Sequence, residues 1–317
     1  MRFRFGLFAL TSAVLLTTGC SAFDDDSPGS DGKVRVAAAF YPLAFVAEEV
    51  SAGTGAEVDL LTRPGKEPHD LELSVRETGD IVSADLVVYE SGFQPAVDDA
   101  VKQNAKGATV DAAKVVDLLP VGHHDGEEHG EHGSEHGDEH GEHDHGDLDL
   151  HFWQDPLRVA DLADEVADQL ADLDSGHAEA YRDNAAELRT KLEKLDSSYA
   201  SGLQDCARET IVASHDAFGY LRKYGLHVES LVGLSPEATP SPAVIGRLQD
   251  LIKTEQITTV FSEPLEPSLG DALARDLDLR NGVLDPVEGL TEASADEDYF
   301  SLMTANLASL KTANGCR

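Results

Sequence analysis

Short hydrophobic runs alternate with helical patterns at the start of the chain. The run VRVAAAF at 34–40 is apolar throughout, which is typical of a buried parallel strand. A helical pattern follows over 42–53 and ends in glycine. Two more strand-like runs are AEVDLLT at 56–62 and ADLVVYE at 84–90. Strands alternating with helices predict an α/β fold with a mainly parallel sheet.

The same alternation restarts in the second half of the chain. The strand-like segments are TIVASHDAF at 210–218, HVESLVGL at 227–234, TTVFSEP at 258–264 and GVLDPVEGL at 282–290. Helices are predicted between them, including a long one over 242–255. We therefore expect a second α/β lobe built like the first. Ligands of open α/β sheets bind beyond the carboxyl ends of the strands, so loops facing a cleft between the lobes are the candidate binding site.

A long helix is predicted between the two lobes. Pro156 suits the first turn of a helix over 155–174, and a second helix follows over roughly 177–202. The apolar positions of the second helix recur at spacings of three and four: Tyr181, Ala185, Leu188, Leu192, Leu195 and Tyr199. One stripe along some 25 residues means a helix on the order of 35 Å long. Such a helix is long enough to run along both lobes as a rigid backbone.

The N-terminal segment MRFRFGLFALTSAVLLTTGC has the pattern of an export signal. Arg2 and Arg4 precede an apolar core that is too short to span a bilayer. Small residues then precede Cys20, an ending that resembles a bacterial lipoprotein signal, in which the cysteine is lipidated. A plain secretory signal with an incidental cysteine is the alternative. The polar, Gly/Ser/Pro-rich segment that follows suits a flexible tether. We expect a lipid-anchored protein in the periplasm or on the outer face of the membrane.

These patterns divide the chain into five parts. They are a signal peptide at 1–19, a tether at 20–33, a first lobe at 34–175 that contains a histidine-rich loop at 121–148, a linking helix at 176–203, and a second lobe at 204–317.

Export also changes how the cysteines are interpreted. With Cys20 assigned to lipid, Cys206 and Cys316 remain as an even pair in an oxidising compartment. Because they lack the CxxC spacing of a metal site, we predict a disulfide bond. It would close about 110 residues and contribute about 4–5 kcal/mol in the chain-entropy model.

The net charge of −36 excludes one class of partner. Nucleic-acid binders concentrate lysine and arginine, so we expect no nucleic-acid partner. The acidic surface favours a soluble protein, which we expect to be a monomer.

The segment HHDGEEHGEHGSEHGDEHGEHDHG is rich in metal-binding side chains. Its histidines are His123, His124, His129, His132, His136, His140, His143 and His145. Glycine follows most of them, so binding must order the chain at about 1–2 kcal/mol for each residue fixed. Several weak accessory sites are therefore expected rather than one tight site. The segment can collect zinc for a better site, buffer zinc, or keep the surface soluble, and capture should weaken as pH falls through about 6.5.

Five histidines lie outside that segment. His69 follows the second predicted strand, His151 precedes the Pro156 helix, and His215 ends the first strand of the second lobe. All three lie in loops that can face the cleft. His177 and His227 have no motif around them, so we expect these two to be structural or exposed.

Five ordered motifs carry a resemblance to a known family. They are PHDLELS, DLHFWQDP, SHDAFGYLRKYGL, FSEPLEPS and LDPVEGL. Together they resemble the metal-binding substrate-binding proteins of ABC importers, and most closely the zinc-binding, ZnuA-like branch. The resemblance covers about 34–317. It implies two lobes joined by a rigid backbone helix, one metal ion between them, and delivery of that ion to a permease powered by a cytoplasmic ATPase.

The resemblance also implies a set of ligands. The family's ligands fall on His69, His151, His215 and Asp285, the last being the aspartate before proline in LDPVEGL. Glu263 and Glu67 are alternative carboxylates of lower rank. Leu150 stands where many members have proline, which affects the stiffness of the loop more than the ligand.

This ligand set favours zinc. Three imidazoles and one carboxylate suit four-coordinate Zn²⁺ at about 2.0–2.2 Å. Manganese prefers more oxygen ligands, and manganese-selective members of the family usually place glutamate where this chain has His215. Mn²⁺ remains the less favoured cofactor.

The same residues favour a binding protein over an enzyme. Four protein ligands leave no open position for a catalytic water, and neither HExxH nor GxSxG is present. The alternatives are a manganese or broad divalent-metal binding protein of the same type, or a zinc buffer or adhesin lipoprotein without a role in transport.

Overall fold

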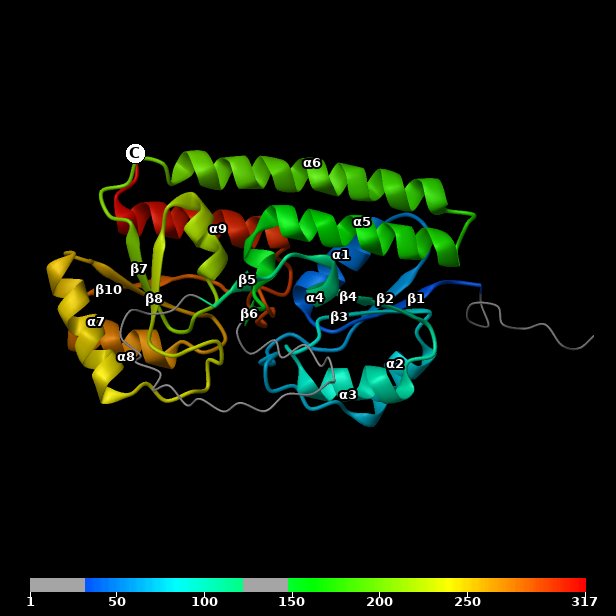
Figure 1. Ribbon diagram of the computed structural model, residues 1–317, viewed down its shortest axis with the longest axis horizontal. Helices are drawn as coiled ribbons and strands as arrows, with labels where there is room; N and C mark the ends of the chain where they lie inside the picture. Colours follow the sequence, from blue (N-terminus) through cyan, green and yellow to red (C-terminus); the bar gives the residue numbers. More distant parts are fainter. Residues whose placement is uncertain (1–31, 122–147) are drawn as a thin grey trace, which may run out of the picture.

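The computed structural model describes residues 32–121 and 148–317. Cys20 and the eight histidines between His123 and His145 lie outside the described residues. Figure 1 shows an elongated molecule with two α/β lobes side by side and a long helix, α6, along one side of both. The predicted α/β fold with two lobes and mainly parallel sheets is confirmed.

The first lobe is a four-stranded parallel sheet with helices around it. Its strand order is β2-β1-β3-β4. The elements are β1 (Arg35–Ala38), α1 (Tyr41–Ser51), β2 (Glu57–Leu60), α2 (Val75–Ser83), β3 (Leu86–Tyr89), α3 (Pro95–Asn104), β4 (Ala108–Asp111) and α4 (Ala112–Val115).

A short antiparallel pair, a 3₁₀ turn and helix α5 complete the first lobe, and helix α6 then connects it to the second. The pair is β5 with β6, and a 3₁₀ turn η2 follows it. These elements are β5 (Leu119–Pro120), β6 (Leu148–Asp149), η2 (Phe152–Gln154), α5 (Pro156–Leu173) and α6 (Ala178–Gly202). Pro156 occupies the first turn of α5, and the Asp155 side chain caps that helix by accepting from the Leu157 N–H at 3.0 Å.

The second lobe repeats the first. Its parallel sheet has the order β10-β9-β7-β8, which read from the other edge is the order of the first sheet. The elements are β7 (Thr210–Ala213), a 3₁₀ helix η3 (Gly219–Tyr224), β8 (His227–Ser230), α7 (Pro242–Thr254), β9 (Thr259–Ser262), α8 (Ser268–Asp276), β10 (Arg280–Val283) and α9 (Tyr299–Asn314).

The shared topology makes positions in the two sheets equivalent. Ala38 ends β1 and Ala213 ends β7, and each strand pairs with the third strand of its own sheet. Phe40 lies two residues after the end of β1, and His215 lies two residues after the end of β7, so these two residues are at equivalent positions. In the same way Glu90, the first residue after β3, is equivalent to Glu263, the first residue after β9.

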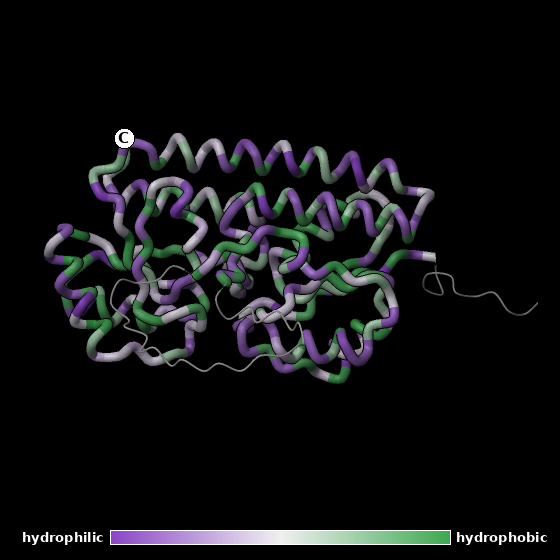
Figure 2. The backbone as a smooth tube through the Cα atoms, viewed as in Figure 1, coloured by the Kyte–Doolittle hydropathy of each residue, from purple (hydrophilic) through white to green (hydrophobic). Residues whose placement is uncertain are grey.

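Helix α6 is 25 residues long, which corresponds to about 38 Å. All six positions of its predicted apolar stripe are buried. Near its start the Asn184 side chain donates to the Val50 carbonyl of α1 at 2.9 Å, and near its end the Tyr199 hydroxyl donates to the Met303 carbonyl of α9 at 2.7 Å. The helix is therefore bonded to both lobes, and in Figure 2 its hydrophilic and hydrophobic residues alternate along its length.

The buried side chains form two cores of unequal size. The larger one fills the first lobe, takes in the inner face of α6 and extends to Leu284, Val287 and Tyr299 of the second lobe. The smaller one lies within the second lobe, around Leu248 and Val260. Cys206 and Cys316 are joined by a disulfide bond that links the start of the second lobe to the end of α9. In the part of the chain that the structure describes, we find no helix with the length and apolarity needed to cross a membrane.

Candidate metal site

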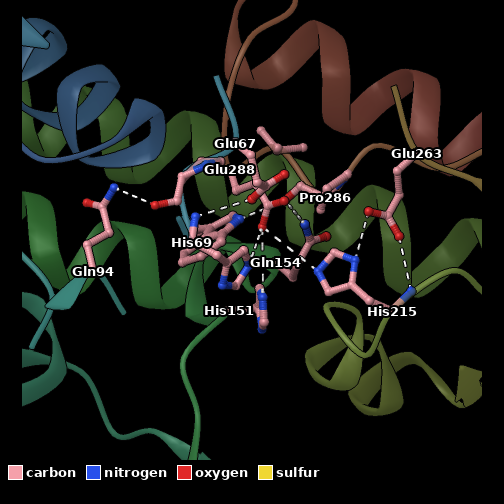
Figure 3. Close-up of polar contacts among 12 residues, drawn as sticks. Glu67, His69, Gln94, His151, Gln154, His215, Glu263, Pro286 and Glu288 are labelled. Carbon is pink, nitrogen blue, oxygen red and sulfur yellow. Dashed lines mark hydrogen bonds and ion pairs between the residues drawn. The ribbon is translucent and has the colours of Figure 1, made fainter. Parts of the chain in front are cut away.

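Four side chains from distant parts of the chain meet where the two lobes join. His69, His151, His215 and Glu288 each offer one ligand atom, and these atoms lie within 4.8 Å of one another. The Glu288 Oε2 atom is 3.2 Å from the His69 Nε2 atom and 3.9 Å from the Nε2 atoms of His151 and His215. Figure 3 shows the carboxylate of Glu288 at the centre of the three imidazole rings.

The four side chains are shielded from solvent to different degrees. The side chains of His151, His215 and Glu288 are 0–1% exposed, and that of His69 is 12% exposed. His69 therefore forms the side of the cluster that is nearest to solvent. The ring of Phe93 lies 4.5 Å from the His69 ring and Trp153 lies 5.3 Å from the His151 ring, so apolar groups surround the polar centre.

His151 is oriented by its neighbour in sequence. Asp149, at the end of β6, accepts from the His151 backbone N–H at 3.0 Å and from the ring Nδ1–H at 2.9 Å. A carboxylate can only accept, so the proton lies on Nδ1 and the Nε2 lone pair faces the cluster. A Cβ at position 219 would collide with the Asp149 Oδ2 atom, so Gly219 leaves space for the Asp149 side chain.

His215 is oriented in the same way by a more distant residue. Glu263 accepts from the His215 ring Nδ1–H at 2.7 Å and from its backbone N–H at 3.2 Å. Burial alone would lower the pKa of His215, but the adjacent Glu263 carboxylate outweighs it and raises the pKa to about 9. Before metal binds, this imidazole holds a proton that a metal ion must displace.

His69 is held by the loop after β2. Gln94 donates to the Pro68 carbonyl at 2.9 Å and to the Thr62 hydroxyl at 2.9 Å, which fixes the loop on both sides of its turn. The His69 backbone N–H donates to Glu67 at 3.2 Å. Burial lowers the pKa of His69, which keeps this imidazole neutral and able to bind a cation.

Glu288 lies in the loop between β10 and α9. Burial would raise the pKa of its carboxyl, but the hydrogen bond from His69 and the charge of His215 lower it to about 2. Glu288 is thus ionised among the histidines. Burial and the nearby Glu288 charge raise the pKa of Glu67 to about 8, so Glu67 carries a proton at neutral pH.

The arrangement fits a cation. The Nε2 atoms of His151 and His215 are buried and have no hydrogen-bond partner among the described residues. Two such imidazole nitrogens facing one carboxylate form a donor set that a cation would complete once it displaces the proton of His215, because buried polar atoms normally have partners. Three imidazole nitrogens and a carboxylate oxygen match the ligand types of tetrahedral zinc, and the carboxylates behind His151 and His215 match the outer contacts usual for zinc-bound histidine.

The structure brings together three of the four residues predicted as ligands and does not bring Asp285 to them. Asp285 Oδ1 accepts from the Val287 N–H at 2.8 Å, and its own backbone N–H donates to Asn306 at 2.8 Å. Val287 has a φ of 59°, a left-handed conformation that turns the chain, and Glu288 follows it. The short side chain of Asp285 closes this turn, and the longer one of Glu288 reaches the histidines.

Sequence reasoning missed Glu288 although it lies in the motif already quoted, LDPVEGL. The presence of a second carboxylate three residues after Asp285 was the available signal. Glu263 and Glu67, the alternatives considered, both lie beside the cluster: Glu263 behind His215 and Glu67 beside His69. Neither belongs to the group of four.

The chain matches a known protein family over most of its length. Residues 36–313 match the family model of ZnuA, described as zinc-uptake complex component A, periplasmic. The chain belongs to this family. The resemblance inferred from the five motifs is confirmed.

Relatives in this family are named as zinc proteins. The chain is 31% identical over 315 residues to the high-affinity zinc uptake system protein ZnuA of Bacillus subtilis, and the match covers 96% of each. It is 34% identical over 310 residues to the zinc-binding lipoprotein AdcA of Streptococcus pneumoniae, covering 94% of this chain. The matched region spans 60% of that protein's length, so the chain corresponds to only part of it.

Solved structures show the same fold. The Zn(II)-bound ZnuA-like domain of Streptococcus pneumoniae AdcA has a TM-score of 0.71 at 30% identity, covering 89% of this chain and 99% of the domain. The laminin-binding protein of Streptococcus agalactiae, described as bifunctional with adhesin and metal-transporting activity, has a TM-score of 0.74 at 26% identity. That match covers 88% of this chain and 99% of the other.

Proposed function

We propose that this protein captures Zn²⁺ outside the cytoplasm and delivers it to the permease of an ABC importer that is driven by a cytoplasmic ATPase. The observation that carries the proposal is the convergence of three imidazole nitrogens on the Glu288 carboxylate, with His151 and His215 each held by a second carboxylate. His69, His151, His215 and Glu288 are the proposed ligands, and Glu288 replaces Asp285 in that set.

The proposed role is binding rather than catalysis. A catalytic zinc keeps one position open for water, whereas the four proposed ligands would fill a tetrahedral shell. Zinc is preferred over manganese because three of the four donors are nitrogens.

Replacing a ligand tests the site. We expect His215→Ala to weaken zinc binding by more than about 100-fold, beyond the 10- to 100-fold typical of outer-shell partners, as measured by competition with a chelator. His227→Ala removes an exposed histidine of the same lobe and serves as the matched control. Unchanged tight binding in His215→Ala would refute the ligand set, and tighter binding of Mn²⁺ than of Zn²⁺ would refute the choice of metal.

Uptake tests the transport role. A strain that lacks this gene should take up less radiolabelled zinc, and the native gene, but not the His215→Ala gene, should restore uptake. Uptake that is unchanged by the deletion would favour a zinc buffer or an adhesin.

Two further parts of the proposal rest on sequence alone. We propose that Cys20 carries the lipid anchor of a monomeric protein, and that the histidine-rich segment collects zinc for the site. Deleting 123–146 should reduce the number of weakly bound ions per chain in calorimetry and leave the tight site intact. Loss of the tight site instead would mean that the segment holds the main ion.

A further inference from the structure

The loop that carries Glu288 belongs to the second lobe in sequence but is bonded to the first lobe. It leaves the second sheet at Leu284, whose N–H donates to the Ser262 carbonyl of β9 at 3.1 Å. Two residues later the Pro286 carbonyl accepts from the Trp153 Nε1–H at 2.7 Å and from the Gln154 side-chain amide at 2.5 Å. Both donors lie in η2, directly after His151.

The far end of the loop is bonded to the first lobe as well. The Leu290 carbonyl accepts from the Gly65 N–H at 2.6 Å, within the loop that carries His69. Between these two attachments the Glu288 side chain meets His69 at 3.2 Å. The first lobe therefore holds this loop on both sides of Glu288.

Hydrogen bonds of His215 and of the next residue go to the second lobe. Its ring and backbone N–H groups both go to Glu263 of the second lobe. The next residue, Asp216, donates its N–H to the Gly233 carbonyl, also in the second lobe. These bonds of His215 and Asp216 thus stay within the second lobe, whereas the loop of Glu288 is bonded to Asn306 of α9 and also to the first lobe.

We propose that Trp153 and Gln154 are positioning residues for Glu288: through the Pro286 carbonyl they hold its carboxylate against His69 and His151. This inference rests on the proposed function. The site then consists of three ligands tied together by bonds between the Glu288 loop and the first lobe, and a fourth ligand, His215, held by bonds within the second lobe.

The two donors suit this task because they have little freedom. Trp153 and Gln154 are 0% and 1% exposed. The Tyr299 hydroxyl donates to the Trp153 carbonyl at 2.6 Å, and the rings of Phe40 and Phe93 lie 5.0 and 5.3 Å from the Trp153 ring. The indole N–H is therefore held in a fixed direction. Val287 in the left-handed region would relax if the loop were released, since a β-branched residue is strained there.

The test is a double-mutant cycle on zinc affinity. Gln154→Met and Trp153→Phe, singly and together, remove the donors and leave an apolar side chain at each position. Each is made in the native chain and in Glu288→Gln. We expect the donor changes to weaken zinc binding by about 10- to 100-fold in the native chain and by less than about twofold in Glu288→Gln, because the donors act through that carboxylate. The absorption spectrum of bound Co²⁺ should shift toward that of Glu288→Gln.

Controls separate positioning from a general loss of stability. Tyr199→Phe removes another buried side-chain bond to a carbonyl, 2.7 Å long and remote from the site, and should lower thermal stability without changing affinity. If Trp153→Phe fails to fold, Gln154→Met alone completes the cycle. Equal losses in both backgrounds, or no loss in the native chain, would overturn the inference. A Glu288→Gln chain that binds zinc like the native one would instead refute the proposed ligand set.

Discussion

The two lobes have a buried glutamate at equivalent positions. Among the described residues, only one of these glutamates is hydrogen-bonded to a residue that follows the neighbouring strand of its sheet. Glu263 follows β9 and holds the ring of His215 at 2.7 Å. Glu90 follows β3 in the first lobe, where the residue equivalent to His215 is Phe40. Both oxygens of Glu90 are buried and have no hydrogen-bond partner among the described residues.

The two lobes share a backbone topology, but the side chains at equivalent positions differ. These side chains decide which lobe has a hydrogen-bonded glutamate–histidine pair at this position. The two side chains are equally inaccessible, at 2% exposed for Glu90 and 3% for Glu263. Burial, together with the charges of Asp111 and Asp149, raises the pKa of Glu90 well above its ordinary value. The protonated form of Glu90 is thus favoured, whereas Glu263 accepts two hydrogen bonds from His215.

Exchanging each glutamate for glutamine should separate the two positions most clearly. We expect Glu263→Gln to weaken zinc binding by about 10- to 100-fold, since it removes the group that orients His215. Glu90→Gln, the matched change in the other lobe, should leave affinity within about twofold of the native value. Chelator competition at pH 7.5 measures both. Equal losses of zinc affinity in the two variants would show that the two glutamates do not differ in function.

The dependence of zinc binding on pH sharpens the same contrast. His215 has its pKa raised to about 9 by Glu263, so the metal-free site holds this proton at neutral pH. A metal ion needs the neutral ring, so affinity should rise with pH by up to about tenfold per unit until about pH 9 and then level off. In Glu263→Gln, the pH above which zinc affinity no longer rises should be lower. A native profile that is flat between pH 7 and 9 would contradict the pairing.

The smallest expected effect is on stability and concerns Glu90. Its folded pKa is raised, so its favourable contribution is complete below the ordinary value near 4.5 and is lost as pH rises toward the folded value. Glu90→Leu removes a buried group without a hydrogen-bond partner and abolishes the loss of folding stability that Glu90 causes at high pH. It should therefore stabilise the protein at pH 8 by about 1–3 kcal/mol. The gain should shrink at pH 4.5. Urea unfolding at both pH values tests this, and destabilisation at pH 8 would point to a partner for Glu90.

Features set by local patterns could be predicted from the sequence. The stripe from Tyr181 to Tyr199 predicted α6, and the alternation of strands and helices predicted both lobes. The motifs around His69, His151 and His215 identified the histidines that the structure brings together. In each case the information lies within a few neighbouring residues.

The features that the sequence did not reveal depend on backbone conformation or on distant contacts. Asp285 and Glu288 are both acidic and three residues apart, and the left-handed turn at Val287 decides which one faces the histidines. The pairing of His215 with Glu263 spans 48 residues, and the bond from Trp153 to Pro286 spans 133. No local pattern encodes such pairs, because they form only when segments far apart in the sequence pack together in the fold.

Helix α6 has a consequence for the spacing of the two lobes. Its contacts with the two lobes, at Asn184 and Tyr199, are 15 residues apart, or about 22 Å along a helix. A helix resists stretching and compression, so this spacing acts as a strut between the lobes. The length of a helix far from the histidines thus bears on the spacing between the two lobes that supply them.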